Sequence, residues 1–528
     1  MKISAAIIII LLLAACGTGE RISPSGLPYI AAAVEEYENE IENGEVEPAE
    51  EPLTAPVTAR TLPDDGVLRL HMRPPMTLNP LANEDVTVAR ILRLIFEPLA
   101  VLDNEFRVTG HLAEFEFASD FGSVNATIRE GAIWSDGKPV TADDIIFSID
   151  FLRRAPLAAI YRANVNEIES AIRLDSRRVQ INFTRASVMA AYSLTFPVIP
   201  QHFFEDPRAT QGQNPPGNGA FIINTVTPMR YMTLTRNPYF SRGRARIERA
   251  EVIFLPNMET DFHAFERGRT DVIHLSLTEW TRHHGVRSPV YEIFPAMYFE
   301  FIGFNFRNTV FRDIHTRQGI AHAFNACDAV AGLYLAHAVR TVTPIHPHNH
   351  AANATIRGPI YDPARAAALL GTVRITEPLI IIANAENRQR TAIAKRLATS
   401  LDRVGIPAYA EILPSAKYFE RLANHDFDMF IGGMELPFAP DVRVFFEAGE
   451  LFLRDPILEA AFSALQFAST EAAYAHAKTR LQQAFAEQLP VIGLAFKHSA
   501  ILTGQRVTGN LSPAPCHVFI NAFEWKIS

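Results

Sequence analysis

The stretch WSDGKPVTADD, residues Trp134–Asp144, is the most distinctive segment of this 528-residue chain. It lies within IREGAIWSDGKPVTADDIIFSI, residues 128–149, and it places Asp136, Asp143 and Asp144 within nine residues, beside a tryptophan. Paired carboxylates are the groups that many hydrolases use, so the first question is whether these three are catalytic. The alternative is that they shape the chain.

Each of the three carboxylates has a local structural role. Asp136 precedes Gly137, and an Asp-Gly pair predicts a tight turn because glycine adopts positive φ at little cost. Thr141 suits the N-cap of a following helix, where Asp144 can reach back in a capping box and Asp143 lies at the positive end of the helix dipole. We therefore interpret the stretch as a turn and a helix start, not as an active site.

Length and composition narrow the class of protein. A chain of 528 residues exceeds what one hydrophobic core supports, so two or three subdomains are expected. With 48% hydrophobic and 20% charged residues the composition is globular. A net charge of -9 argues against a nucleic-acid partner, which requires a basic surface.

The N-terminus is typical of an exported protein. Lys2 precedes an apolar run that has the length of a signal-peptide core, and it ends in Leu13–Cys16, which resembles a bacterial lipobox. We expect residues 1–15 to be a lipoprotein signal peptide, Cys16 to carry the lipid, and residues 16–62, rich in Glu and Pro, to be a tether. The alternative is a plain signal peptide with an incidental cysteine.

Strand-like and helix-like segments alternate through the body of the chain, which predicts an α/β fold. Cys327 falls in an apolar helical pattern and is expected to be buried, whereas spacing does not show whether it pairs with Cys516. The patterns predict a helix of about three turns within 85–103 that Pro98 stops, a central strand at 298–306, one long helix at 313–335 and a strand that ends in a glycine turn at 427–434.

An ordered series of motifs, running from about residue 67 to 500, resembles the extracytoplasmic solute-binding proteins of peptide-type ABC importers, family 5, the oligopeptide, dipeptide and nickel group. The block at 128–149 is the most specific of them. The others are TLNP at 77–80, IFEPL at 95–99, GHLAEFE at 110–116, GNGAF at 217–221, LTRNPYF at 234–240, IGFNF at 302–306, RQGIAHAFNACD at 317–328, YDPARAAALL at 361–370 and LPVIGLAF at 489–496.

The resemblance implies a two-lobed clamshell, the type II, peptide-binding-like form of the periplasmic binding proteins, with an extra subdomain. Lobe I would comprise residues 63–95, 206–297 and 498–528; the extra subdomain, residues 96–205, would pack on lobe I; and lobe II would comprise residues 298–497. Ligand would be held between lobes that close by hinge motion. The implied partners are a small solute such as a peptide, the permease and ATPase subunits of an ABC importer, and a bacterial membrane reached through the lipid anchor, with the protein a monomer on its periplasmic or extracellular face.

The resemblance also implies which residues contact ligand. An extended segment after the LNP motif lines the cleft in peptide binders, and here it contains Glu84, Asp85 and Val86, although Asp85 has the alternative role of capping the next helix. A second wall follows the glycines, and two further strands contribute. The residues implied there are Phe301, Gly303, Phe430, Gly432, Gly433, Met434, Glu435, Leu436 and Leu494.

This sequence departs from the peptide-binding pattern at the second wall. Peptide binders carry a tryptophan where Gly433 stands, an arginine where Phe430 stands, and an aspartate for the ligand's amino group most nearly at Leu436. Glu435 could replace that aspartate, because a buried ammonium group requires a paired anion. The cleft is therefore expected to be less polar than that of a peptide binder.

Metal binding and catalysis are two further functions that the sequence could suggest. His346, His348 and His350 alternate along one segment, as metal ligands can, but a proline-rich loop without a nearby carboxylate is more often solvated, so no metal or cofactor is expected. No GxSxG, HExxH or phosphate-loop motif occurs, so an enzyme is not expected. The remaining alternatives are a binder of a metal chelate or apolar small molecule, and a sensor or adhesin that works without a permease.

Overall fold

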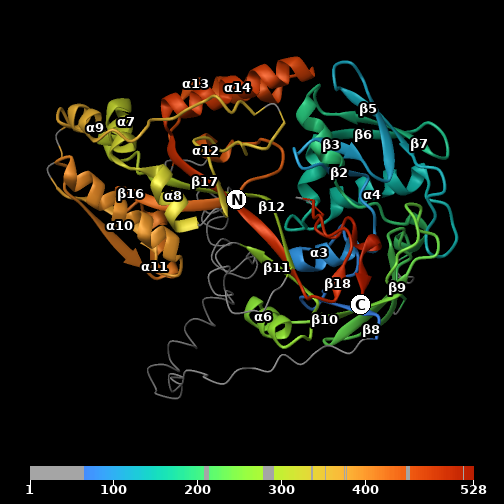
Figure 1. Ribbon diagram of the computed structural model, residues 1–528. Helices are drawn as coiled ribbons and strands as arrows, with labels where there is room; N and C mark the ends of the chain where they lie inside the picture. Colours follow the sequence, from blue (N-terminus) through green and yellow to red (C-terminus); the bar gives the residue numbers. More distant parts are fainter. Residues whose placement is uncertain are drawn as a thin grey trace.

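The structure is a computed structural model that describes residues 65–528 apart from 207–212, 277–289, 335–336, 351, 374, 376, 448–451 and 515–516. The predicted signal peptide, the tether, Cys16 and Cys516 therefore lie outside the described residues. Figure 1 shows the segments of the N-terminal half, with α4 and β2–β7, on one side, and helices α7–α14 on the other side. The long strands β12 and β17 run between the two groups.

The first sheet has four strands and begins at the predicted start of the folded body. β1 alternates half-buried and buried residues, as its apolar and polar residues alternate in sequence, and it pairs in parallel with β10. The helix α3 (Val86–Leu92) follows β1, and Arg73 N donates to Thr87 Oγ1 at 2.9 Å. The strand order is β1 (Val67–Met72), β10 (Arg249–Phe254), β9 (Tyr231–Arg236) and β8 (Phe221–Thr227).

The second sheet, also of four strands, carries the opening stretch of the sequence. Its core is continuous with that of the first sheet, since Leu68 and Leu70 belong to the same buried cluster as Val124 and Trp134. The alternating segment VNATI, residues 124–128, forms most of β5. The strand order is β4 (Ala113–Phe117), β5 (Ser123–Ile128), β7 (Arg178–Phe183) and β6 (Ile168–Arg173), with α4 (Ala142–Arg154) packed beside it.

The local structure of WSDGKPVTADD is the one predicted. Gly137 has a φ of 87°, as the turn requires, and α4 begins directly after Thr141. Asp144 is buried and its carboxylate accepts hydrogen bonds from Thr141 N at 2.8 Å, Gln201 N at 2.8 Å and Trp134 Nε1 at 3.2 Å. The stretch is therefore a structural joint that fixes the tryptophan to the start of a helix.

The third sheet is the largest, and β12 is central in it, as predicted. One face packs in a core with α11, α13 and α14, and the other packs in a core with α7–α10. The strand order is β11 (Val272–Ser276), β17 (Val491–Thr503), β12 (Val290–Phe304), β16 (Met429–Glu435), β14 (Leu379–Asn384) and β15 (Ala408–Leu413), and β13 (Ala338–Arg340) also pairs with β17. The helices are α7 (Ile314–Ala323), α8 (Ala326–Tyr334), α9 (Pro363–Leu370), α10 (Arg388–Arg403), α11 (Ser415–Asn424), α13 (Pro456–Gln466) and α14 (Glu471–Gln488).

A β-hairpin near the second sheet in sequence packs into the core of the third sheet. It consists of β2 (Ala100–Leu102) and β3 (Val108–Gly110), and its tip residue Phe106 is fully buried among residues of the large sheet's core. The Phe106 ring lies 5.0 Å from the His346 ring and 6.0 Å from the Phe438 ring. The remaining short elements are α5 (Gln201–Phe204), α6 (Met258–Glu266), α12 (Val444–Glu447), β18 (Val507–Thr508) and β19 (Lys526–Ile527).

Four sequence predictions were wrong. The helix predicted within 85–103 is present, but it ends at Leu92 and not at Pro98, because the chain then turns and Glu97 N is held by Asn218 Oδ1 at 2.9 Å. The long helix at 313–335 is two helices, since Phe324 is extended between α7 and α8.

The other two errors concern glycine and cysteine. The glycine turn at 427–434 does not exist, because Gly432 and Gly433 lie inside β16. Cys327 is exposed, in the first turn of α8. The domain limits stay a prediction, and among the described residues no helix is both long and apolar enough to cross a bilayer.

Candidate functional site

The two glycines of β16 lie where neighbouring side chains occupy the space that a Cβ would need. A Cβ on Gly433 would lie 2.5 Å from Arg390 Nη2 and 2.7 Å from Glu300 Cδ. A Cβ on Gly432 would lie 2.7 Å from the Phe430 ring. No side chain, and certainly no tryptophan, fits at Gly433 while the Glu300–Arg390 pair is in place.

Glu300 is the centre of a buried ionic cluster that the sequence analysis missed. Its carboxylate, 0% exposed, accepts from Arg390 Nε at 3.0 Å and pairs with Lys497 Nζ at 2.6 Å. Arg390 Nη2 also donates to Tyr298 Oη at 2.9 Å, and Lys497 Nζ lies 4.1 Å from the centre of the Tyr298 ring. A glutamate in the middle of an apolar central strand was the available signal, since such a residue is rarely buried without partners.

The charges in this cluster keep Glu300 ionised. Burial alone raises the pKa of the Glu300 carboxyl, but the positive charges of Arg390 and Lys497 outweigh it, so the pKa lies below its usual value. One carboxylate is shared by two cations, so the cluster carries a net positive charge. Lys497 is nearly buried, and its position beside Tyr298 places that charge on one face of the sheet.

Strand register shows which side chains share that face. Directly paired residues of antiparallel strands lie on the same face, as do alternate residues of one strand. Tyr298 pairs with Glu435, and His274 pairs with Ile501, which alternates with Ser499 and Lys497 along β17. We call the resulting row the polar stripe; it consists of His274, Ser499, Lys497, Tyr298 and Glu435.

Arg90, in the last turn of α3, lies within electrostatic range of two residues of the polar stripe. Burial lowers the pKa of Arg90 to about 10, and the carboxylates of Glu435 and Asp85 oppose this shift. Burial, together with the charge of Arg90, holds the pKa of His274 well below its usual value, so His274 is neutral at pH 7. Arg90 therefore interacts electrostatically with both ends of the stripe, yet its guanidinium makes no direct hydrogen bond or ion pair with any described residue.

The predicted segment after the LNP motif lies at the start of α3. Asp85 is the N-cap, and its carboxylate accepts from Thr87 N at 2.7 Å and Val88 N at 3.0 Å. The capping role, one of the two interpretations of this residue, is thus present. Glu84 and Val86 are exposed.

The predicted residues of the second wall divide between the two faces of the sheet. Gly433 and Glu435 lie on the face of the polar stripe, since they pair with Glu300 and Tyr298. The others point into packed cores and are buried beside aromatic or aliphatic neighbours. These are Phe301, Gly303, Phe430, Gly432, Met434, Leu436 and Leu494.

Two of the three histidines of the HPHNH segment lie together, since the His346 and His348 rings are 5.1 Å apart, but His350 does not join them. The His346 ring lies between Phe106 and Phe496, at 5.0 and 4.7 Å, and burial lowers the pKa of His346 to about 3. His350 instead stacks on Tyr474, at 5.7 Å. Within the described ranges no group of three or more His, Cys, Asp or Glu side chains is arranged to hold a metal ion.

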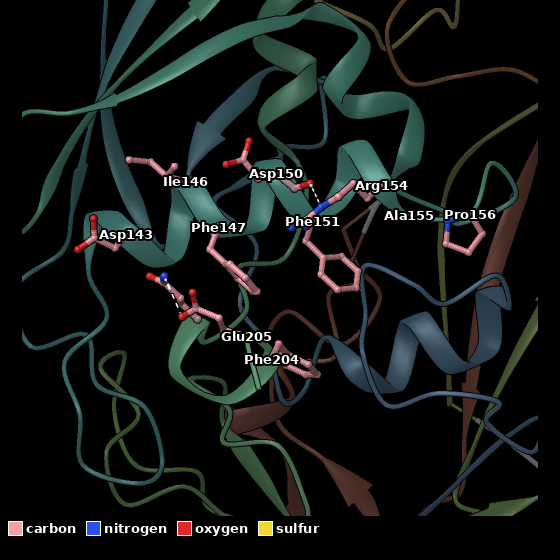
Figure 2. Close-up of a pocket in the computed structure, with 11 residues that line it drawn as sticks. Asp143, Ile146, Phe147, Asp150, Phe151, Arg154, Ala155, Pro156, Phe204 and Glu205 are labelled. Atoms are coloured by element: carbon pink, nitrogen blue, oxygen red, sulfur yellow. Dashed lines mark hydrogen bonds between the residues drawn. The ribbon is translucent and has the colours of Figure 1, made fainter. Parts of the chain in front are cut away.

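A hollow on the outer side of α4 is separate from these groups. It has a volume of about 630 Å³ and is lined by Phe147, Phe151, Phe204 and the acidic Asp143 and Glu205, as Figure 2 shows. A neighbouring hollow of about 660 Å³ shares Phe151 and Phe204. Neither hollow is lined by a residue of the polar stripe.

Comparisons with known proteins place the chain in a family. The family model described as "Bacterial extracellular solute-binding proteins, family 5 Middle" matches residues 107–447. A Brucella ovis protein named "Putative ABC transporter peptide-binding protein" is 24% identical over 288 residues, which cover 52% of this chain and 54% of that protein. The chain thus spans about half the length of the curated relatives it matches.

Solved structures share the fold over most of the chain. The ABC transporter substrate binding protein CtaP from Listeria monocytogenes has a TM-score of 0.76 at 15% identity, covering 87% of this chain and 99% of its own. NikZ from Campylobacter jejuni, in complex with Ni(L-His), has a TM-score of 0.67 at 18% identity, covering 88% of this chain and 100% of its own. The fold is therefore the two-lobed α/β fold of peptide-binding-type periplasmic binding proteins, as predicted.

Proposed function

Because this chain belongs to family 5 of the bacterial extracellular solute-binding proteins, we propose that it captures a peptide or peptide-like small solute and delivers it to the permease of an ABC importer. The family consists of transport components rather than enzymes, and its members act in the periplasm or outside the cell. The site proposed for the solute lies between α3 and the polar stripe, with Glu435 as the group that binds the ligand's ammonium.

One observation carries this proposal. Arg90 lies in α3, beside β1 of the first sheet, and Glu435 ends β16 of the third sheet. The two residues interact electrostatically, but they do not form an ion pair. Two opposite charges held near one another but unpaired are suited to a ligand that carries the complementary charges. Glu435 is exposed, so a ligand can reach its carboxylate.

We further propose that the protein is anchored to the membrane by a lipid. Cys16 would carry the lipid and residues 16–62 would hold the body away from the membrane. The protein would act as a monomer, with the ATPase subunits energising release through the permease. A membrane fraction that retains the wild-type protein but releases a Cys16→Ala variant would support the anchor.

Native mass spectrometry of the gently purified protein tests the proposed ligand class. Retained masses that match a mixture of short peptides support it, whereas a metal chelate or an apolar molecule would contradict it. Glu435→Ala should weaken the binding of a ligand with a free ammonium more than tenfold, because the ammonium loses its paired anion. Unchanged affinity would remove Glu435 from the site.

A further inference from the structure

The HPHNH segment is held in one conformation by its own hydrogen bonds and by α14. The His346 ring accepts at Nδ1 from His348 N at 3.1 Å, and Asn349 N donates to His346 O at 2.9 Å. Lys478, a fully buried residue of α14, donates from Nζ to Asn349 Oδ1 at 2.5 Å and to His350 O at 2.7 Å. The segment therefore forms a fixed surface on the third sheet's side of the molecule.

The tip of the β2–β3 hairpin packs on this surface. The Phe106 ring lies 5.0 Å from the His346 ring, which also lies 4.7 Å from the Phe496 ring. His350 N donates to Glu105 O at 2.8 Å, and His350 Nδ1 lies 3.3 Å from the same oxygen. Because burial lowers the pKa of His346 to about 3, its ring is neutral at pH 7 and suits an apolar contact with Phe106.

A second contact joins the hairpin tip to the third sheet's helices. Val188 N donates to Ala468 O, in the turn between α13 and α14, at 2.9 Å. Tyr192 Oη donates to Phe106 O at 2.9 Å, and Val188, Tyr192 and Phe106 belong to one buried core. We call the whole contact the clasp; it consists of Glu105, Phe106, Val188 and Tyr192 on one side and of His346, His350 and Ala468 on the other.

The clasp is separate from the proposed ligand site. Phe496, which packs against the His346 ring, alternates with Lys497 along β17, so these two side chains lie on opposite faces of the strand. No residue of the clasp belongs to the polar stripe. The elements of the N-terminal half and the helices α13 and α14, which Figure 1 shows on opposite sides of the molecule, are therefore joined by contacts that involve none of the groups proposed to bind ligand.

We propose that the clasp holds the two lobes closed without ligand, so that ligand enters when the clasp opens and does not itself cause the closure. Full burial of a phenylalanine side chain favours the closed arrangement roughly 10- to 100-fold, and Phe106 is fully buried. The two backbone hydrogen bonds that cross the clasp add to this preference. The inference goes beyond the proposed function, since it concerns the resting state of the protein whatever ligand it binds.

Hydrogen exchange of the full-length protein tests the clasp directly, because the amides of Val188 and His350 donate across it. The protein is dialysed, and native mass spectrometry establishes that it carries no ligand. Phe106→Ala should speed the exchange of these two amides by roughly tenfold or more, while amides inside β5 and β14, on either side of the clasp, change by less than about threefold. Small-angle X-ray scattering should give a larger radius of gyration for Phe106→Ala than for the wild type.

Two further variants separate opening of the clasp from a general loss of stability. Phe221→Ala removes an equally buried phenylalanine from the core of the first two sheets, and it should leave the Val188 and His350 amides and the radius of gyration unchanged. Lys478→Met keeps the bulk of the side chain but removes the donors that fix the HPHNH segment. It should speed the exchange of the His350 amide by about threefold or more and leave β5 and β14 unchanged.

Each outcome decides the inference. Exchange of the two crossing amides in the ligand-free wild type as fast as in Phe106→Ala, or an equal acceleration in Phe221→Ala, overturns it. Faster exchange in Phe106→Ala without a larger radius of gyration also overturns it, because the hairpin alone would then have moved. If Phe106→Ala loses protection in β5 and β14 as well, it has lost its fold, and Lys478→Met decides: a selective acceleration supports the clasp, and none overturns it.

Discussion

Replacing Gly433 by alanine adds one methyl group to the most crowded point of the polar network. The new Cβ would lie 2.5 Å from Arg390 Nη2 and 2.7 Å from Glu300 Cδ, so at least one of the two side chains has to move. The end of an arginine side chain can usually yield to such a contact at little cost. Here it cannot, because Arg390 is 2% exposed and bonds to Glu300 at 3.0 and 3.2 Å and to Tyr298 Oη at 2.9 Å.

The expected loss of stability follows from what the movement breaks. Separating a buried ion pair so that one partner is left uncompensated costs roughly 3–5 kcal/mol. Lys497 remains beside Glu300 at 2.6 Å and compensates part of that charge, so we place Gly433→Ala at the lower end, a loss of about 3 kcal/mol in the free energy of unfolding.

Urea unfolding of the purified protein measures this loss, with Gly332→Ala as the matched control. Gly332 lies inside α8, and the nearest atom to a Cβ there is Arg396 Nη1 at 3.8 Å. Alanine in a helix interior is more stable than glycine by roughly 0.5–1 kcal/mol, so the control should be neutral or more stable. A Gly433→Ala protein as stable as the control would refute the view that the Glu300–Arg390 pair rigidly fills this space.

Three further predictions concern the structural joints. Asp144→Asn should lower the free energy of unfolding, measured with urea, by about 2 kcal/mol, because one of the three N–H groups that donate to the carboxylate loses its acceptor. Asp143→Asn, on the surface, is the control and should change this free energy by less than about 0.5 kcal/mol. Phe106→Ala should cost about 3–5 kcal/mol through the cavity left in the large sheet's core, measured in the same way; a loss below 1 kcal/mol would contradict the buried hairpin tip. The pKa of His346 is about 3 when folded and 6.5 when unfolded, so the unfolded chain binds more protons below pH 6.5 and stability falls as the pH falls. At pH 4.5, two units below the unfolded value, the contribution of His346 to this loss is about 2.7 kcal/mol, so a His346→Phe protein should lose that much less stability than the wild type between pH 7 and pH 4.5.

The sequence predicted best where local chemistry decides the structure. The turn at Gly137 and the cap by Asp144 depend on residues within ten positions of each other, and both are present. The central strand was also predictable, because a continuous apolar run is typical of a strand covered on both faces. The end of the helix predicted within 85–103 was wrong for the opposite reason, since a contact from Asn218, distant in sequence, holds Glu97 in the turn that follows α3.

The candidate site depends on strand register and therefore escaped a reading of motifs. The motif positions Phe301, Phe430 and Gly432 face a packed core, whereas the polar stripe comes from alternate positions of β11, β12, β16 and β17 that no linear pattern connects. The expectation of a less polar cleft was drawn partly from Phe430, which strand register places in a packed core, and it stays a prediction.

The glycine at position 433 shows how one substitution reorganises such a site. A tryptophan there would lie on the face that Glu300, Tyr298 and Lys497 occupy, so the bulky ring and the ionic cluster exclude each other. Replacing an aromatic wall by fixed charges exchanges a surface that accepts many side chains for one that reads charge. In the proposed site, selectivity should therefore come from charged groups of the ligand rather than from its apolar side chains.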